Sequence, residues 1–121
     1  MTVEERKELT KSYLGKTVKI SIDRPLGFVH QKGKYDLIYP VNYGFVPGVI
    51  GGDGEELDVY LLGVDYSVDE YECEIIAVAH RRNDSEDKLI GAPIGVRFSK
   101  EKIESAIRFQ EQYFETEVEI L

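Results

Sequence analysis

Three carboxylates stand within six residues of one another, at Asp53, Glu55 and Asp58. Glycines surround the first of them, and the apolar residues after the third predict a buried strand over 57–62. Acidic side chains at the mouth of a strand can converge on a hard cation, which prefers oxygen ligands. The glycines allow the tight backbone turn that brings such oxygens together. The segment therefore predicts a metal site.

These carboxylates follow the string Tyr39-Pro-Val-Asn-Tyr-Gly-Phe-Val-Pro-Gly48. That string, the Gly-rich turn and the segment Asp53-Gly-Glu-Glu-Leu-Asp58 together resemble the magnesium-dependent soluble inorganic pyrophosphatases, family I. The resemblance is specific over residues 39–62 and thins outside them, and the chain is shorter than a usual member. It implies Mg²⁺-dependent hydrolysis of inorganic pyrophosphate to two phosphates by metal-activated water, with Mn²⁺ as an alternative cofactor.

The resemblance also implies roles for individual residues of this segment. The first and last Asp of the family's signature bind metal, which implies that role for Asp53 and Asp58. Glu55 stands where the family has a candidate general base, although Glu is one methylene longer than Asp. Tyr43 corresponds to a tyrosine that forms hydrogen bonds in the family's active site, where a phenol can orient a water or a carboxylate.

A second acidic group precedes Lys88, in the polar connector over 81–87. The family has a pair of metal-binding aspartates there, followed by a phosphate-contacting lysine that Lys88 matches. The first acid falls on Asn83 or Asp84, and the second falls on Glu86 by spacing or on Asp87 by residue type. We predict Asp84 and Asp87 as metal ligands, with Glu86 as the alternative to Asp87.

Substrate contacts are expected from Arg24, His30, Lys88 and Tyr113. Tyr113 falls where the family has a phosphate-contacting tyrosine, but Phe114 replaces the lysine that follows it there. The N-terminal third also lacks a lysine and an arginine of the family. Arg24 is the predicted substitute, because a guanidinium binds phosphate through two parallel hydrogen bonds. His30 is a further candidate, either for binding phosphate or for shuttling a proton.

Composition limits the class of protein. The chain has 121 residues, which fits a single domain over 1–121 with 42% apolar residues for its core. Its formal net charge is −8, from 23 acids against 15 bases, which disfavours a nucleic-acid partner. The single cysteine, Cys73, excludes an internal disulfide. No stretch reaches transmembrane length and no signal-peptide core is seen, so we expect a cytoplasmic protein without a membrane partner.

The pattern of elements predicts a small fold that is mainly β with α additions. A capping box at Thr2 and Glu5 begins a helix, with Gly15 as a plausible stop. Strands are expected over 18–22, 57–62, 73–80 and 88–92, and residues 28–38 are ambiguous, with a short hairpin as one interpretation. A second helix runs from Ser99 to about Glu115. Short strands with Gly and Pro turns favour a small closed barrel. The resemblance implies an OB-like antiparallel barrel with an N-terminal and a C-terminal helix.

Two other functions remain open. The lost basic positions would admit an organic diphosphate or a nucleotide in place of pyrophosphate. A catalytically inactive barrel would instead bind a phosphorylated ligand or a protein partner. We expect a small-molecule phosphate as the substrate, and the sequence is compatible with a homo-oligomer.

Overall fold

The structure is a computed structural model that describes all 121 residues. In chain order the elements are α1 (Val3–Lys11), β1 (Thr17–Arg24), β2 (Val29–Gln31), β3 (Asp36–Ile38), β4 (Asn42–Ile50), β5 (Glu56–Leu61), β6 (Glu70–Arg81), β7 (Lys88–Ala92), α2 (Lys100–Glu111) and β8 (Thr116–Ile120).

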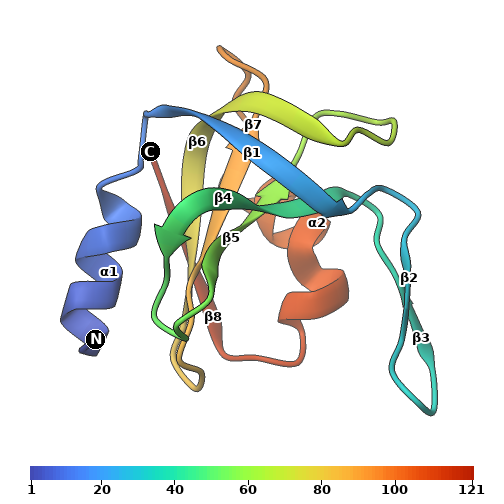
Figure 1. Cartoon of the computed structure of the whole chain (residues 1–121), viewed down its shortest axis with the longest axis horizontal. Coiled ribbons are helices and arrows are strands. Elements are labelled where there is room, and N and C mark those ends of the chain that lie inside the picture. Colours follow the sequence, from blue (N-terminus) through green and yellow to red (C-terminus); the bar gives the residue numbers. More distant parts are fainter.

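Five strands close into a barrel in the order β1-β4-β5-β7-β6, because β1 pairs with both β4 and β6. The long strand β6 pairs with two strands along the same edge. Its residues 70–74 pair with β1, and its residues 77–81 pair with β8. Figure 1 shows α1 beside this barrel and α2 against it. The predicted small barrel with two helices is confirmed.

One pairing, between β5 and β7, is parallel, whereas we expected an antiparallel barrel. The reason is that β7 inserts between β5 and β6. A strand antiparallel to β6 at that place necessarily runs in the same direction as β5.

Alternate residues of the barrel strands fill two separate cores. In β5, Val59 and Leu61 belong to a cluster to which all five barrel strands contribute, so this cluster fills the barrel. Tyr60 points the other way and packs with Ile103 and Ile107 of α2. Because successive side chains of a strand face opposite sides, β5 is buried on both faces.

The predicted N-terminal capping box is present. The Thr2 hydroxyl accepts a hydrogen bond from the Glu5 backbone at 3.1 Å, and the Glu5 carboxylate accepts one from the Thr2 backbone at 2.9 Å. The helix ends at Lys11, and Gly15 then turns the chain with a φ of 83°. The Gly15 N–H donates to the carbonyl of Ile75 at 2.9 Å, which attaches the turn to β6.

The C-terminal helix begins after Ser99, whose hydroxyl accepts a hydrogen bond from the Lys102 backbone at 3.2 Å. It ends at Glu111, earlier than the predicted Glu115, because the chain must turn before β8 starts at Thr116. Neither helix has the length and apolar character that crossing a membrane requires.

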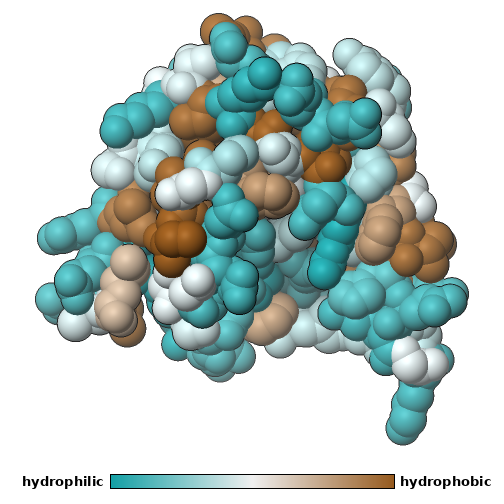
Figure 2. Space-filling model, viewed as in Figure 1, coloured by the Kyte–Doolittle hydropathy of each residue, from teal (hydrophilic) through white to brown (hydrophobic).

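Strand β4 was not predictable from the sequence pattern, because Gly44 and Pro47 interrupt it. Gly44 allows β1 and β4 to approach closely, since a Cβ there would lie 1.8 Å from the carbonyl oxygen of Ser21. The ambiguous segment over 28–38 forms the hairpin β2–β3, which projects from the barrel (Figure 1). Hydrophilic side chains cover its projecting end in Figure 2.

We predict that Gly44→Ala destabilises the fold by about 3 kcal/mol or more, at the upper end of the cost of overpacking. The added methyl group would meet only backbone atoms, of Ser21 and Ile22, which cannot move without opening the β1–β4 pairing. Urea unfolding measures the loss. Gly51→Ala is the control, because its Cβ would lie 3.4 Å from a Leu57 methyl, an ordinary contact. Equal unfolding midpoints for the two variants would contradict the prediction.

Candidate active site

A cleft of about 680 Å³ lies at one mouth of the barrel, between the β2–β3 hairpin and the C-terminal end of α2. Eight of the ten residues predicted for the site line it: Arg24, His30, Tyr43, Asp53, Glu55, Asp58, Lys88 and Tyr113. Asp84 and Asp87 do not line it.

The ammonium of Lys88 is at the centre of the cleft floor, with only 3% of its side chain exposed. Its Nζ donates to the Tyr43 hydroxyl at 2.7 Å, to Asp58 at 2.6 Å and to Glu86 at 2.8 Å. The Tyr43 hydroxyl in turn donates to Asp58 at 2.8 Å. Burial, followed by the negative charge of Asp58, raises the pKa of Tyr43 well above its ordinary value, so the phenol keeps its proton.

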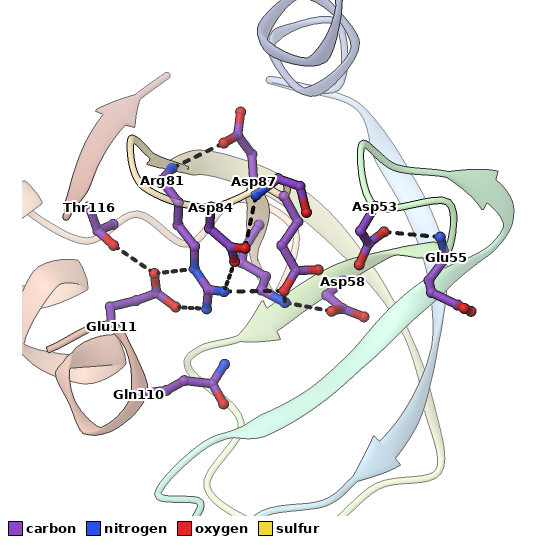
Figure 3. A network of polar contacts seen from close by, with 12 residues as sticks. Asp53, Glu55, Asp58, Arg81, Asp84, Asp87, Gln110, Glu111 and Thr116 are labelled. Carbon is purple, nitrogen blue, oxygen red and sulfur yellow. Dashed lines mark hydrogen bonds and ion pairs between the residues drawn. The ribbon is translucent and has the colours of Figure 1, made fainter. Parts of the chain in front are cut away.

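The carboxylates of the cleft are crowded. Burial and a hydrogen bond with Asp53 raise the pKa of Glu86 to about 6, and the same bond lowers the pKa of Asp53. Burial, with Asp58 nearby, also raises the pKa of Asp23 in β1. Figure 3 shows Asp53 and Asp58 on the same side of the site, with the Glu55 backbone donating to Asp53 at 3.0 Å. A cation that binds between such carboxylates lowers the electrostatic repulsion between them.

A divalent cation fits these residues. The possible ligand atoms are all oxygens, as Mg²⁺ and Mn²⁺ prefer, and the raised pKa of Glu86 reflects its burial and its nearness to Asp53 when no cation lies between them. No three His, Cys, Asp or Glu side chains meet closely enough to enclose a metal ion by themselves. This arrangement suits Mg²⁺, which usually keeps several waters and takes one or two carboxylates together with substrate phosphates.

Arg81 is a residue of the site that sequence reasoning missed. Its guanidinium pairs with Glu111 through two bonds of 2.9 and 2.5 Å, and it also donates to Asp84 at 2.9 Å and Glu86 at 3.1 Å. The ring of Phe114 covers it, 3.7 Å from the guanidinium carbon. Burial lowers the pKa of Arg81, but the ion pair with Glu111 raises it overall, so the charge is permanent. Figure 3 shows Glu111 of α2 reaching this group.

A chain of hydrogen bonds extends from this ion pair to the other side of the cleft. The Tyr60 hydroxyl donates to Glu111 at 2.5 Å and accepts from the Gln110 amide at 2.8 Å. The Gln110 oxygen accepts from the Tyr39 hydroxyl at 2.8 Å, and Tyr39 accepts from Arg24. The network fixes the cleft floor to α2, which sequence patterns alone could not place there.

The cations on the hairpin side form no ion pairs with carboxylates. The Arg24 guanidinium lies over the rings of Phe28 and Tyr39, at 5.9 and 5.5 Å from their centroids. His30 Nδ1 lies 3.3 Å from Arg24 Nη1. Burial and then the charges of Arg24 and Lys32 lower the pKa of His30, so its ring is mostly neutral at pH 7 and can accept from Arg24. Arg24 and Lys32 therefore remain available to an anion.

The structure places Asp87 away from the cleft, in a buried cluster. Its carboxylate accepts from the Arg81 backbone at 3.0 Å and from His80 at 2.9 Å, and it lies 3.3 Å from Arg6 Nε. Figure 3 shows this carboxylate directed toward the Arg81 backbone and away from the acids of the cleft. Glu86 lines the cleft instead, because residues two apart at the start of a strand, such as Glu86 and Lys88, share a face. Of the two alternatives, the position of Glu86 is the one that fits a metal ligand.

Asp84 does not fit the predicted role either. Its carboxylate is engaged by Arg81, and its backbone carbonyl accepts from Arg6 at 2.6 Å. Tyr113 does line the cleft, at its outer edge, where its ring stacks with that of Tyr35 at 6.1 Å between centroids. Tyr35 was not among the predicted residues.

The closed barrel with its two helices is the fold of solved inorganic pyrophosphatases. The structure from Ehrlichia chaffeensis matches with a TM-score of 0.65 at 20% identity, covering 88% of this chain and 87% of that one. The structure from Neisseria gonorrhoeae matches with a TM-score of 0.60 at 20% identity, covering 82% and 74%. At these identities the likeness concerns the fold.

The chain belongs to the inorganic pyrophosphatase family, because the family model described as inorganic pyrophosphatase matches residues 10–117. The protein named inorganic pyrophosphatase 2 from Pseudomonas syringae pv. tomato is 32% identical, over 54% of this chain and 47% of that protein. The chain thus spans about half the length of this curated relative.

We predict that His80 stabilises the fold more at acidic than at alkaline pH. A hydrogen bond with Asp87, aided by Glu119 at 3.0 Å, raises the pKa of His80 although burial lowers it. A raised folded-state pKa gives stability that is complete below the unfolded value of about 6.5 and is lost as pH rises through the folded value. Urea unfolding of His80→Gln should therefore show a larger loss, relative to the native chain, at about pH 5.5 than at about pH 8.5. An equal loss at both would contradict the assignment.

Proposed function

We propose that this chain hydrolyses inorganic pyrophosphate to two phosphates with the help of a divalent cation. The observation that carries this proposal is that Asp53, Asp58 and Glu86 line the same cleft as Lys88 and Arg24. Carboxylates without cations would repel a polyanion, and cations without carboxylates would bind it without holding a metal. A cleft with both suits a metal-bound phosphoanhydride.

Asp53, Asp58 and Glu86 would hold the cation, with Asp23 close enough to Asp58 to contribute. When bound, such a cation neutralises phosphate charge and lowers the pKa of water. We propose Mg²⁺ as the metal and Mn²⁺ as its substitute. We also propose the cytoplasm as the site of action, where the free thiol of Cys73 stays reduced.

The cations of the cleft divide the work of binding. Lys88 is already occupied by Asp58 and Glu86, so it sets the positions of these acids and adds positive charge behind them. Arg24, with no carboxylate partner, is free to donate two parallel hydrogen bonds to phosphate oxygens. His30 beside it accepts or passes on a proton when phosphate replaces the contact with Arg24.

Glu55 and Tyr43 are the candidates for the chemical step. No side-chain hydrogen bond holds the Glu55 carboxylate, which leaves it able to take a proton from the attacking water. The water oxygen bonds to one phosphorus, the bridging P–O bond breaks, and the leaving phosphate keeps the electron pair. Tyr43, fixed between Lys88 and Asp58, holds the Asp58 carboxylate in one orientation throughout.

We expect Asp58→Asn to lower pyrophosphate turnover by about 100-fold or more, as removal of a group that stabilises transition-state charge commonly does. The substitution keeps the shape of the side chain and removes the charge that would hold the cation. Phosphate release at saturating Mg²⁺ measures the effect, and Asp65→Asn, an exposed acid outside the cleft, is the control. A melting curve checks that each variant folds. Near-normal turnover of Asp58→Asn would favour a binding protein over an enzyme.

Metal binding distinguishes the acids of the connector. We expect Glu86→Gln to weaken Mn²⁺ binding by about tenfold or more. Asp84→Asn should leave the affinity unchanged, because Asp84 lies outside the cleft with its carboxylate on Arg81. Electron paramagnetic resonance of free Mn²⁺ during a titration gives both constants without any enzymatic assay. The reverse order of the two variants would return the ligand role to Asp84.

A further inference from the structure

The cleft is larger than its inner, carboxylate-lined part. Its volume of about 680 Å³ lies well inside the range of about 300–1,000 Å³ of pockets that enclose drug-sized ligands. The acids Asp53, Asp58 and Glu86 occupy one side together with Lys88, and the hairpin and the end of α2 enclose the rest. A bare pyrophosphate with its cation would leave the outer part of this space unfilled.

Two tyrosines line this outer part and stack against each other at its edge. Tyr35 comes from the turn of the β2–β3 hairpin and Tyr113 from the segment after α2. Their rings lie 6.1 Å apart between centroids with planes 27° from parallel, and they are 48% and 53% exposed. Exposed parallel aromatic rings at the edge of a cleft form a surface on which another planar ring can stack.

Unpaired positive charge lies on the same side as these rings. Arg24 and Lys32 line the cleft and form no ion pair, whereas Arg81 and Lys88 are occupied by carboxylates of the cleft floor. Lys32 and Tyr35 belong to the same hairpin turn, where the backbone N–H of Lys32 donates to the backbone carbonyl of Tyr35 at 2.9 Å. Arg24 and Lys32 can therefore attract phosphate on the side of the cleft where the two tyrosines lie.

From this arrangement we propose that the cleft accepts diphosphates that carry an aromatic base, the class of nucleoside diphosphates, with the base against Tyr35 and Tyr113. The inference rests on the proposed phosphoanhydride hydrolysis and names a further substrate class for the same site. The terminal phosphate lies toward Asp53 and Asp58, and the phosphate that carries the nucleoside lies toward Arg24 and Lys32.

The reaction keeps the chemistry proposed above. The oxygen of a water bonds to the terminal phosphorus, and the bond from that phosphorus to the bridging oxygen breaks. The bridging oxygen keeps the electron pair and leaves as part of the nucleoside monophosphate. One proton of the water stays on the released phosphate, and the other passes to Glu55 and then to solvent.

Two non-hydrolysable probes separate base recognition from catalysis. Methylene diphosphonate represents pyrophosphate, and α,β-methylene-ADP adds the nucleoside. In calorimetric titrations with Mg²⁺ we expect the nucleotide probe to bind about tenfold more tightly, since its base stacks on the tyrosines and the diphosphonate has no base. In Tyr35→Ser the ratio of the two affinities should fall toward one, because one of the two rings that form the stacking surface is lost. Tyr66→Ser, which removes a 60% exposed tyrosine outside the cleft, should keep the ratio of the native chain.

The outcomes distinguish this inference from the proposed function. Equal affinities in the native chain, or a ratio that survives Tyr35→Ser, would overturn the stacking inference. Phosphate release from pyrophosphate but none from ADP would overturn the inference and leave the proposed function in place. Base-dependent binding with no phosphate release from either compound would overturn the proposed hydrolysis. Release of phosphate from both, with the ADP rate lowered in Tyr35→Ser, supports both.

Discussion

A buried ammonium determines how the acids of this cleft are arranged. Lys88 is almost fully enclosed, so its charge must be neutralised inside the protein, and Asp58 and Glu86 do this together with the Tyr43 hydroxyl. These partners come from β4, β5 and the connector before β7. One side chain thus fixes three segments relative to one another. Two of the candidate metal ligands, Asp58 and Glu86, are thus held in place by their hydrogen bonds with Lys88.

The two sides of the cleft differ in whether their cations form ion pairs with carboxylates. On the floor, Arg81 and Lys88 share Glu86, and Glu111 completes the pairing of Arg81 from α2. On the hairpin side, Arg24 is held by aromatic rings and a phenol and not by an acid. The paired charges of the floor make it rigid, and the unpaired cation on the hairpin side can bind an anion. This division separates the residues that position the site from those that meet the ligand.

Much of the barrel and half of the site can be predicted from local patterns, because apolar alternation and the Asp53–Asp58 string are local signals. Strand β4 cannot be predicted in this way, because Gly44 is needed where β4 approaches the backbone of β1, and the sequence of β4 alone does not show that contact. By residue type, Asp87 is the better candidate for a metal ligand than Glu86. The alternation of side chains along the strand, however, directs Glu86 and not Asp87 into the cleft. Arg81 carries no sequence signal, because its role depends on Glu111, which lies 30 residues away in the chain.

The last segments of the chain complete the cleft floor, and this has a consequence during synthesis. Glu111, Phe114 and strand β8 follow every barrel strand in the sequence. Every barrel strand is therefore synthesised before Glu111 and Phe114, which pair with Arg81 and cover it. A variant that lacks Glu111 would therefore keep every barrel strand but would leave the buried guanidinium of Arg81 without its main counter-charge, which is costly.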